Sequence, residues 1–333
     1  MTPLPRLVKG LVAGALVGAA IATTASADGP PPSPSIRFVT LNVFHGGPLS
    51  GWTGRDGHLE TRLDLVAQAL RALAPDVVAL QEASWSRHRG EVAARLAERL
   101  GWNHVYAPSS MRVFGIDWLD RAGAAVMDFA EGPAVLGRFP IVHSEAFKLP
   151  QCGWRLDPRV LLVADLATPA GALRVFSTHI SGHHCQAEAV AALVRERRGD
   201  TPGVLMGDFN AVESSPAITA LMASSGVIDV FRAAHPDATG FTVYQPVMAS
   251  ERRASRRVDY VFLIPGRAFP GEVTDSRVVI DKPIELTGGR TLWPSDHYGV
   301  LADLILFPPP TAVDGHGVAR VATTSRPART TAP

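Results

Sequence analysis

The sequence predicts one mixed α/β domain, with β-sheets packed inside and helices covering them. Apolar runs of strand length alternate with amphipathic helical stretches in part of the chain and follow one another elsewhere. No segment recurs at a fixed period, so a repeat architecture is excluded. The 333 residues are 46% hydrophobic and 19% charged, which is ordinary for a globular protein of this length.

The individual elements follow from periodicity and from turn residues. The clearest helix covers residues 59–73, because Leu63, Val66 and Leu70 recur at three- and four-residue intervals and Pro75 stops the pattern. Helices with similar spacing are expected at residues 90–100, 186–198 and 216–224. Short apolar runs bounded by polar or turn residues predict strands at residues 36–43, 76–80, around 135, 161–167, 173–178, 204–210, 258–263 and 300–306.

Both ends of the chain lack a core-forming pattern. Residues 1–27 resemble a secretory signal peptide, with a basic start, an apolar stretch and an Ala-Ser-Ala cleavage pattern. A retained membrane anchor is the alternative. Residues 28–35 are expected to form a Pro-rich leader, residues 36–307 the folded domain, and residues 308–333 a disordered tail. We therefore expect a secreted, extracellular protein, monomeric and with no obligatory protein partner.

The charge of the expected mature chain is close to neutral. Removing Arg6 and Lys9 with the signal peptide takes the formal net charge from +1 to −1. Such a protein has no overall positive field to draw it to nucleic acid. Any binding to a polyanion must come from a local patch, for which the arginine-rich segment 252–257 is the candidate.

A predicted hairpin brings the two cysteines close together. Strands 161–167 and 173–178 are joined by the turn at 168–171, and extending the hairpin backward places Cys152 within about two residues of the position opposite Cys185. Both cysteines lie in the exported part of the chain, where a disulfide is favoured. Two free thiols are the alternative.

Several predicted strands have polar side chains at or next to one end. Taken singly, such a residue is as well explained by a turn, a helix cap or a satisfied core histidine. Taken together, polar ends gathered at one edge of a sheet would form the floor of a cleft. The residues concerned are Asn42, Gln81-Glu82, His179, Asp208 with Asn210, Asp259 and Asp296-His297.

These stretches resemble the endonuclease/exonuclease/phosphatase superfamily, which includes pancreatic-type deoxyribonucleases and neutral sphingomyelinases. Six motifs occur in the family's order over residues 36–306: Leu41-Asn42, Leu80-Gln81-Glu82, Ser177-Thr178-His179, Gly207-Asp208-Phe209-Asn210, Arg257-Val258-Asp259-Tyr260 and Ser295-Asp296-His297. The resemblance implies a four-layer α/β/β/α sandwich with two central mixed β-sheets. It also implies a phosphoesterase that depends on a divalent metal, Mg²⁺ or in its place Mn²⁺.

The resemblance assigns a metal site to three of these residues. Glu82 would be the principal ligand, with Asn42 beside it and Asp296 in the metal and phosphate neighbourhood. Mg²⁺ keeps most of its waters and takes only one or two protein carboxylates, so a single glutamate with help is sufficient.

The other residues would carry the catalytic chemistry. By resemblance, Asp208 would orient or deprotonate the attacking water and Asn210 would hold a phosphate oxygen. Asp259 would fix the orientation of His297, and His179 would lie on the leaving-group side. The sequence has no Gly-x-Ser-x-Gly and no phosphate-loop motif, which agrees with direct attack by water.

Arg159 is a further candidate, for binding the phosphate of the substrate. In the predicted hairpin it lies nearly opposite His179, and a guanidinium there could hold phosphate bidentately. A surface arginine beside Asp157 is the alternative.

The expected activity is hydrolysis of phosphodiester bonds in nucleic acid or a small organophosphate. The alternatives are a sphingomyelin or phospholipid phosphodiesterase and a catalytically idle binding module. The loops at 48–58 and 109–132 are the candidate determinants of substrate choice, because specificity in a shared fold resides in loops.

Overall fold

The computed structural model describes residues 35–45, 57–87, 89–109, 116, 118–119, 130–152 and 159–308, which belong to one compact unit. The expected signal peptide lies outside the described residues. So do the leader apart from its last residue, the tail apart from its first residue, and most of the two candidate loops. No helix among the described residues is long and apolar enough to cross a membrane.

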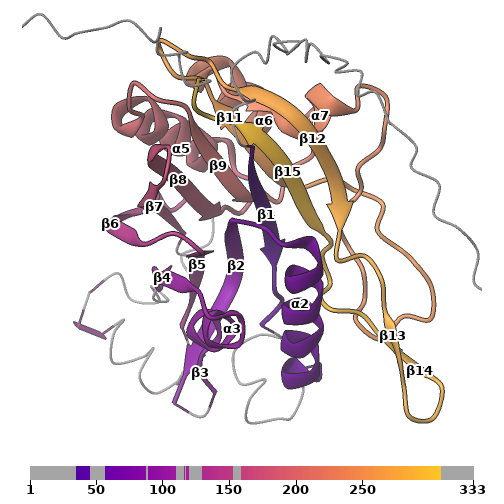
Figure 1. Ribbon diagram of the computed structural model, residues 1–333. Helices are drawn as coiled ribbons and strands as arrows, with labels where there is room; N and C mark the ends of the chain where they lie inside the picture. Colours follow the sequence, from indigo (N-terminus) through magenta and orange to yellow (C-terminus); the bar gives the residue numbers. More distant parts are fainter. Residues whose placement is uncertain are drawn as a thin grey trace, which may run out of the picture. The chain divides into compact units, whose positions relative to one another are not determined.

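Two mixed β-sheets form the centre of this unit (Figure 1). Among the described residues, the first sheet has the strand order β12-β15-β1-β2-β5-β4, with β3 paired to β2, and the second has the order β10-β11-β9-β8-β7-β6. The strands of the first sheet are β1 (Ile36–Asn42), β2 (Val77–Ser86), β3 (Gly90–Glu91), β4 (Asn103–Tyr106), β5 (Ala130–Gly137), β12 (Glu272–Val279) and β15 (Gly299–Ile305). Those of the second are β6 (Ile141–Lys148), β7 (Val160–Thr168), β8 (Gly171–His179), β9 (Gly203–Asp208), β10 (Ile228–Asp229) and β11 (Asp259–Ile264).

Helices cover the outer faces of the two sheets (Figure 1). Side chains of α2 (Leu59–Leu73) and α3 (Val92–Leu100) pack on the first sheet, and those of α5 (His184–Arg197) and α6 (Pro216–Ser225) pack on the second. A third cluster, which includes Phe38 and Val77 of the first sheet and Val175 and Met206 of the second, fills the space between the sheets. The described residues therefore form the four-layer α/β/β/α sandwich that the sequence predicts. A short helix α7 (Val230–Ala234) and a hairpin of β13 (Ile284–Leu286) with β14 (Arg290–Leu292) complete the elements.

Local sequence explains where the helices begin and end. The buried residues of α2 include Leu59, Leu63 and Leu70, which lie on one face, and the left-handed Ala74 closes the helix by donating its backbone N–H to the carbonyl of Leu70. In α6, Ser215 is the N-cap and accepts a hydrogen bond from the backbone N–H three residues later.

The hairpin and the disulfide are as expected. β7 pairs with β8 with Leu161 opposite Thr178 and Thr168 opposite Gly171, and Cys152 is bonded to Cys185. The sequence pattern missed β6 and β12, which both lie at sheet edges. Many of their side chains face solvent, so neither strand forms the apolar run that marks a buried strand.

Candidate functional site

The polar residues of the first sheet meet at one edge because of how its strands pair. β1 and β2 are parallel with Asn42 opposite Gln81, so both strands end at this edge. β15 is antiparallel to β1 and therefore starts there, just after His297. β5 is antiparallel to β2, which puts Glu131, near its start, at the same edge.

The second sheet aligns its polar residues in one row across three strands. β8 and β9 are parallel with His179 opposite Asp208, and β11 is antiparallel to β9 with Asp259 opposite Asp208. Glycine is required at 207, because a Cβ there would lie 2.1 Å from the carbonyl oxygen of Thr178 in β8. This close approach lets the ends of β8 and β9 come together.

Hydrogen bonds across the two sheets join these edges into one site. The Asn42 amide nitrogen lies 3.1 Å from Oε1 of Glu82 and 3.1 Å from Oδ2 of Asp208, which belong to different sheets. Nε2 of His297 lies 3.8 Å from the same Asp208 oxygen. The predicted residues thus converge, although they come from strands far apart in the sequence.

Two of these residues adopt left-handed backbone angles. Glu82 has φ 54° and lies where the pairing of β2 with β5 shifts register, between Leu80 and Ala83. This irregularity re-aims a side chain out of the regular alternation of the strand. Asn210 has φ 49°, a region that asparagine tolerates, and its backbone N–H donates to Oδ1 of Asp208 at 2.8 Å.

Asp259, His297 and Asp208 form a buried charged line. Nδ1 of His297 lies 2.9 Å from Oδ2 of Asp259. Burial opposes the charged imidazole, but Asp259 and then Asp208 raise the pKa of His297 to about 10, so His297 is protonated at neutral pH. Burial also raises the pKa of Asp208, to about 7, which suits a group that accepts a proton from water.

His179 and Arg159 form a second, different pair. Nδ1 of His179 lies 2.9 Å from the Arg159 guanidinium, and its Nε2 lies 3.3 Å from Oδ2 of Asp208. An arginine can only donate, so the tautomer protonated on Nε2 satisfies the contacts to Arg159 and Asp208. The Asn210 amide nitrogen also lies 2.9 Å from Nε2, and it donates to the carbonyl of Ile180 at 2.9 Å. Burial, followed by the charge of Arg159, holds the pKa of His179 well below its usual value. His179 is therefore neutral, and Arg159 is engaged with His179 and with Oγ of Ser181.

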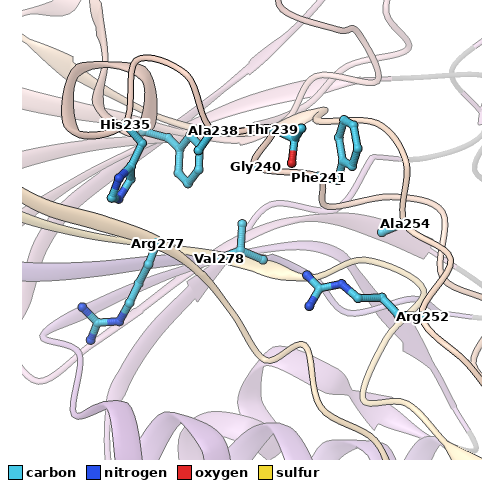
Figure 2. Close-up of a pocket in the computed structure, with 10 residues that line it drawn as sticks. His235, Ala238, Thr239, Gly240, Phe241, Arg252, Ala254, Arg277 and Val278 are labelled. Atoms are coloured by element: carbon cyan, nitrogen blue, oxygen red, sulfur yellow. The ribbon is translucent and has the colours of Figure 1, made fainter.

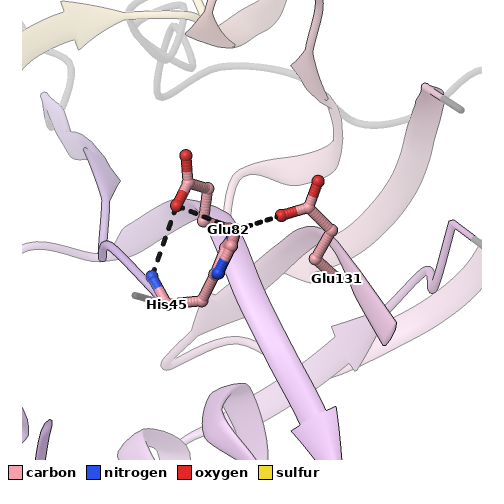
Figure 3. Close-up of side chains that lie close together, drawn as sticks. All are labelled: His45, Glu82 and Glu131. Carbon is pink, nitrogen blue, oxygen red and sulfur yellow. Dashed lines mark hydrogen bonds and ion pairs between the residues drawn. The ribbon is translucent and has the colours of Figure 1, made fainter. Parts of the chain in front are cut away.

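The two carboxylate oxygens of Glu82 have different partners. Its Oε1 accepts from Asn42, while its Oε2 lies 3.2 Å from Nε2 of His45, which also lies 2.5 Å from Oε2 of Glu131 (Figure 3). Oε1 of Glu131 is 3.4 Å from the Arg159 guanidinium. Neither Glu131 nor His45 was among the site residues predicted from the sequence. Glu131 reaches the site because the start of β5 pairs with the end of β2, and the sequence pattern did not reveal this pairing.

The donor set at this edge fits a hard divalent cation. Glu82 retains partial exposure, and burial raises the pKa of the nearby Asp296 to about 6, although the charges of His297 and Arg62 oppose this shift. Asn42 presents its amide nitrogen to Glu82, while its Oδ1 accepts from the backbone N–H of Phe44. In this orientation the Asn42 amide nitrogen aligns Glu82, and its oxygen faces the backbone N–H of Phe44.

Arg62 stabilises the segments next to the site and was not predicted. It is 1% exposed, and its guanidinium donates to the carbonyl oxygens of Gly57, Val43, Phe44 and Pro294 at 2.8 to 3.2 Å. The carbonyls of Val43 and Phe44 follow Asn42, that of Pro294 precedes Asp296, and that of Gly57 lies just before α2. Arg62 therefore fastens together the two segments that carry site residues.

The arginine-rich segment has less free charge than its sequence indicates. Arg252 pairs with Asp281, Arg253 with Glu251, and Arg257 is buried against Asp229. An open hollow of about 340 Å³ lies beside this segment, lined in part by Arg252, Arg277 and Phe241 (Figure 2).

A second hollow, of about 550 Å³, shares the wall formed by Ala238, Thr239 and Phe241. It reaches Val212 and Glu213, which follow the site residue Asn210 in the chain, and its lining includes the exposed Arg256. These hollows adjoin the segment that leads away from the site.

Comparison with known proteins agrees with this geometry. Residues 39–297 match the model of the Endonuclease/Exonuclease/phosphatase family. No curated protein matches the chain.

Solved structures share the fold. An endonuclease/exonuclease/phosphatase from Beutenbergia cavernae is 25% identical, with a TM-score of 0.60 over 84% of this chain and 73% of that one. The mannosyl-6-phosphatase Bt3783 of Bacteroides thetaiotaomicron is 20% identical, with a TM-score of 0.62 over 82% of this chain and 100% of that one. The TDP2 protein of D. rerio, solved with a single-strand DNA product, is 19% identical, with a TM-score of 0.57 over 81% and 98%. The family match covers most of the chain, which therefore belongs to the endonuclease/exonuclease/phosphatase family of phosphoester hydrolases.

Proposed function

We propose that the protein is a secreted phosphodiesterase that depends on a divalent cation and hydrolyses its substrate by in-line attack of water. The observation that carries this proposal is the buried line Asp259–His297–Asp208 beside Glu82. It puts a protonated imidazole and a carboxylate of raised pKa next to a partly exposed carboxylate. A phosphoester needs these three kinds of group for attack, charge stabilisation and positioning.

The residues divide these tasks according to their surroundings. Asp208 takes the proton of the attacking water and is aligned by the backbone N–H of Asn210. His297 is charged, so its Nε2–H stabilises negative charge that develops on the phosphoryl oxygens. Asp259 holds His297 in its orientation and in its charged form.

His179 has a supporting task in this proposal. A neutral imidazole that accepts from Arg159 and donates to Asp208 is a poor general acid, but it fixes the Asp208 carboxylate. Arg159 acts through His179, in place of direct contact with phosphate. Asn210 is exposed, and its amide nitrogen, which donates to the carbonyl of Ile180, has a second N–H that can hold a phosphate oxygen.

Glu82 and Asp296 would hold the cation, with Asn42 aligning Glu82. When bound, a divalent cation neutralises charge on the phosphoryl group and lowers the pKa of a coordinated water. The raised pKa of Asp296 supports this assignment, because a cation would relieve the cost of its burial.

Hydrolysis assays on the purified chain test the proposal. The substrates are plasmid DNA, sphingomyelin, an artificial phosphodiester and its monoester counterpart, each with metal and with EDTA. We expect metal-dependent cleavage of a diester, and a loss of at least about 100-fold in turnover for Glu82→Gln and for Asp208→Ala. Asp64→Asn, on the exposed face of α2, is the matched control and should keep wild-type turnover. Full activity in EDTA, or in either site variant, would contradict the proposal.

Export and domain limits belong to the same proposal. We infer that residues 1–27 are removed as a signal peptide and that residues 36–307 form the catalytic domain. The Cys152–Cys185 disulfide supports export, because such bonds persist in oxidising compartments. N-terminal sequencing of the secreted protein tests the cleavage position.

A further inference from the structure

His45 and Glu131, which the proposed function leaves unused, form a cluster with Glu82. Nε2 of His45 and one carboxylate oxygen from each glutamate all lie within 4.8 Å of one another. The three side chains come from the segment after β1, from β2 and from the start of β5, and they point toward one another in Figure 3.

In each glutamate of the cluster, the Oε1 atom contacts a side chain outside the cluster. Oε1 of Glu82 accepts from the Asn42 amide, and Oε1 of Glu131 lies 3.4 Å from the Arg159 guanidinium. The backbone N–H of His45 donates to Oε2 of Glu82 at 3.3 Å. These contacts leave Oε2 of both glutamates facing the imidazole, so the three donor atoms are arranged before any ligand arrives.

We propose that His45, Glu82 and Glu131 bind a divalent first-row transition-metal ion, Mn²⁺ or Zn²⁺, in preference to Mg²⁺. The inference rests on the proposed function, because it identifies the cation that Glu82 and Asp296 would hold and adds His45 and Glu131 to its ligands. Imidazole nitrogen is a good ligand for transition metals, whereas Mg²⁺ takes oxygen ligands and keeps its waters. A site with oxygen ligands alone would not favour a transition metal over Mg²⁺ in this way.

The separations within the cluster are compatible with one ion. Metal–nitrogen and metal–oxygen bonds of about 2.0 to 2.2 Å place neighbouring ligands roughly 3 to 3.5 Å apart. The His45–Glu82 separation is 3.2 Å, and the His45–Glu131 separation of 2.5 Å needs to open slightly when the ion replaces the proton between them.

Access distinguishes this cluster from the other grouping of similar donors. Asp208, Asp259 and His297 also bring three donor atoms together, but their side chains are only 1%, 0% and 8% exposed. His45, Glu82 and Glu131 are 13%, 19% and 21% exposed, so an ion can enter and keep water ligands there.

Metal binding, measured without substrate, tests the inference. Calorimetric titration of the full chain should give Mn²⁺ at least about tenfold tighter binding than Mg²⁺. His45→Gln should weaken Mn²⁺ binding at least about tenfold and leave Mg²⁺ binding within about threefold, because only the nitrogen ligand is lost. Glu131→Gln should weaken the binding of both ions. His104→Gln removes a comparable ion pair, with Glu91 at 3.0 Å, and should change neither.

Pulsed electron paramagnetic resonance gives a second reading that does not depend on variant stability. Mn²⁺ bound to the wild type should show coupling to a ligating ¹⁴N nucleus, and His45→Gln should abolish it. Wild-type Mn²⁺ with no nitrogen coupling, or coupling that persists in His45→Gln, would overturn the inference.

The two proposals fail separately in these experiments. Nitrogen-coupled Mn²⁺ without hydrolysis of any phosphoester would refute the proposed function and leave the metal site standing. Metal-dependent hydrolysis with equal affinity for Mn²⁺ and Mg²⁺ would refute the metal site and leave the function standing.

Discussion

Replacing Arg62 by leucine tests whether the buried guanidinium holds the site together. The substitution leaves the carbonyl oxygens of Gly57, Val43, Phe44 and Pro294 without a donor they have in the native protein. The contacts to Val43 and Pro294 are buried, and an unsatisfied buried acceptor costs about 1–3 kcal/mol. Removing a buried charge returns part of that cost, so we expect a net loss of about 3 kcal/mol in the free energy of unfolding.

Urea unfolding at pH 7 measures this loss. At a denaturant slope of about 3 kcal/mol per molar, the expected change lowers the midpoint by about 1 M. Arg71→Leu, in the last turn of the same helix and exposed, is the matched control and should stay within about 0.5 kcal/mol of the wild type. A midpoint for Arg62→Leu that equals that of Arg71→Leu would refute the reasoning. Arg62→Lys should also be destabilised, because one ammonium group cannot reproduce the fork of a guanidinium.

Three further predictions follow from contacts in and near the site. Asp259→Asn removes the charge that contributes most to keeping His297 protonated. Turnover should fall about 100-fold or more, and the alkaline limb of the pH–rate profile should move to lower pH. An unchanged profile would contradict the pairing of Asp259 with His297. Arg232 lowers the pKa of Glu213 to about 2. The stability that this pair contributes is therefore complete above the ordinary carboxyl pKa and is lost as pH falls toward 2. The melting temperatures at pH 3 and pH 6 should differ less in Glu213→Gln than in the wild type. Gly207→Ala forces a Cβ against the backbone of β8, and calorimetry should show destabilisation of about 2 kcal/mol or more; an unchanged melting temperature would mean that the strands tolerate the contact.

The sequence predicted those parts of the site that follow buried strands. Asn42 and Asp208 each end an apolar run, so their position at a strand end could be read directly. Their mutual contact could not, because it joins the two sheets, and no local pattern determines how two sheets face each other. It was expected only through the family resemblance.

Two residues that contact the site but do not follow a buried strand, Glu131 and Arg62, were not predicted. Glu131 lies near the beginning of a strand, and only the antiparallel pairing of β5 with β2 brings it to the active edge. Arg62 lies on the helix face that otherwise carries apolar residues, where an arginine looks like an interruption of the pattern. Three of the four carbonyl groups that Arg62 binds lie 18 or more residues away in the chain, so these contacts exist only after folding.

The position of the last strand has a consequence for how activity is acquired during synthesis. β15 lies between β12 and β1, inside the first sheet, and His297 immediately precedes it. A polypeptide that is still emerging from the ribosome, or clipped before this strand, lacks both the charged imidazole and the partner of the first strand. The site is therefore complete only after the chain has been translated through β15.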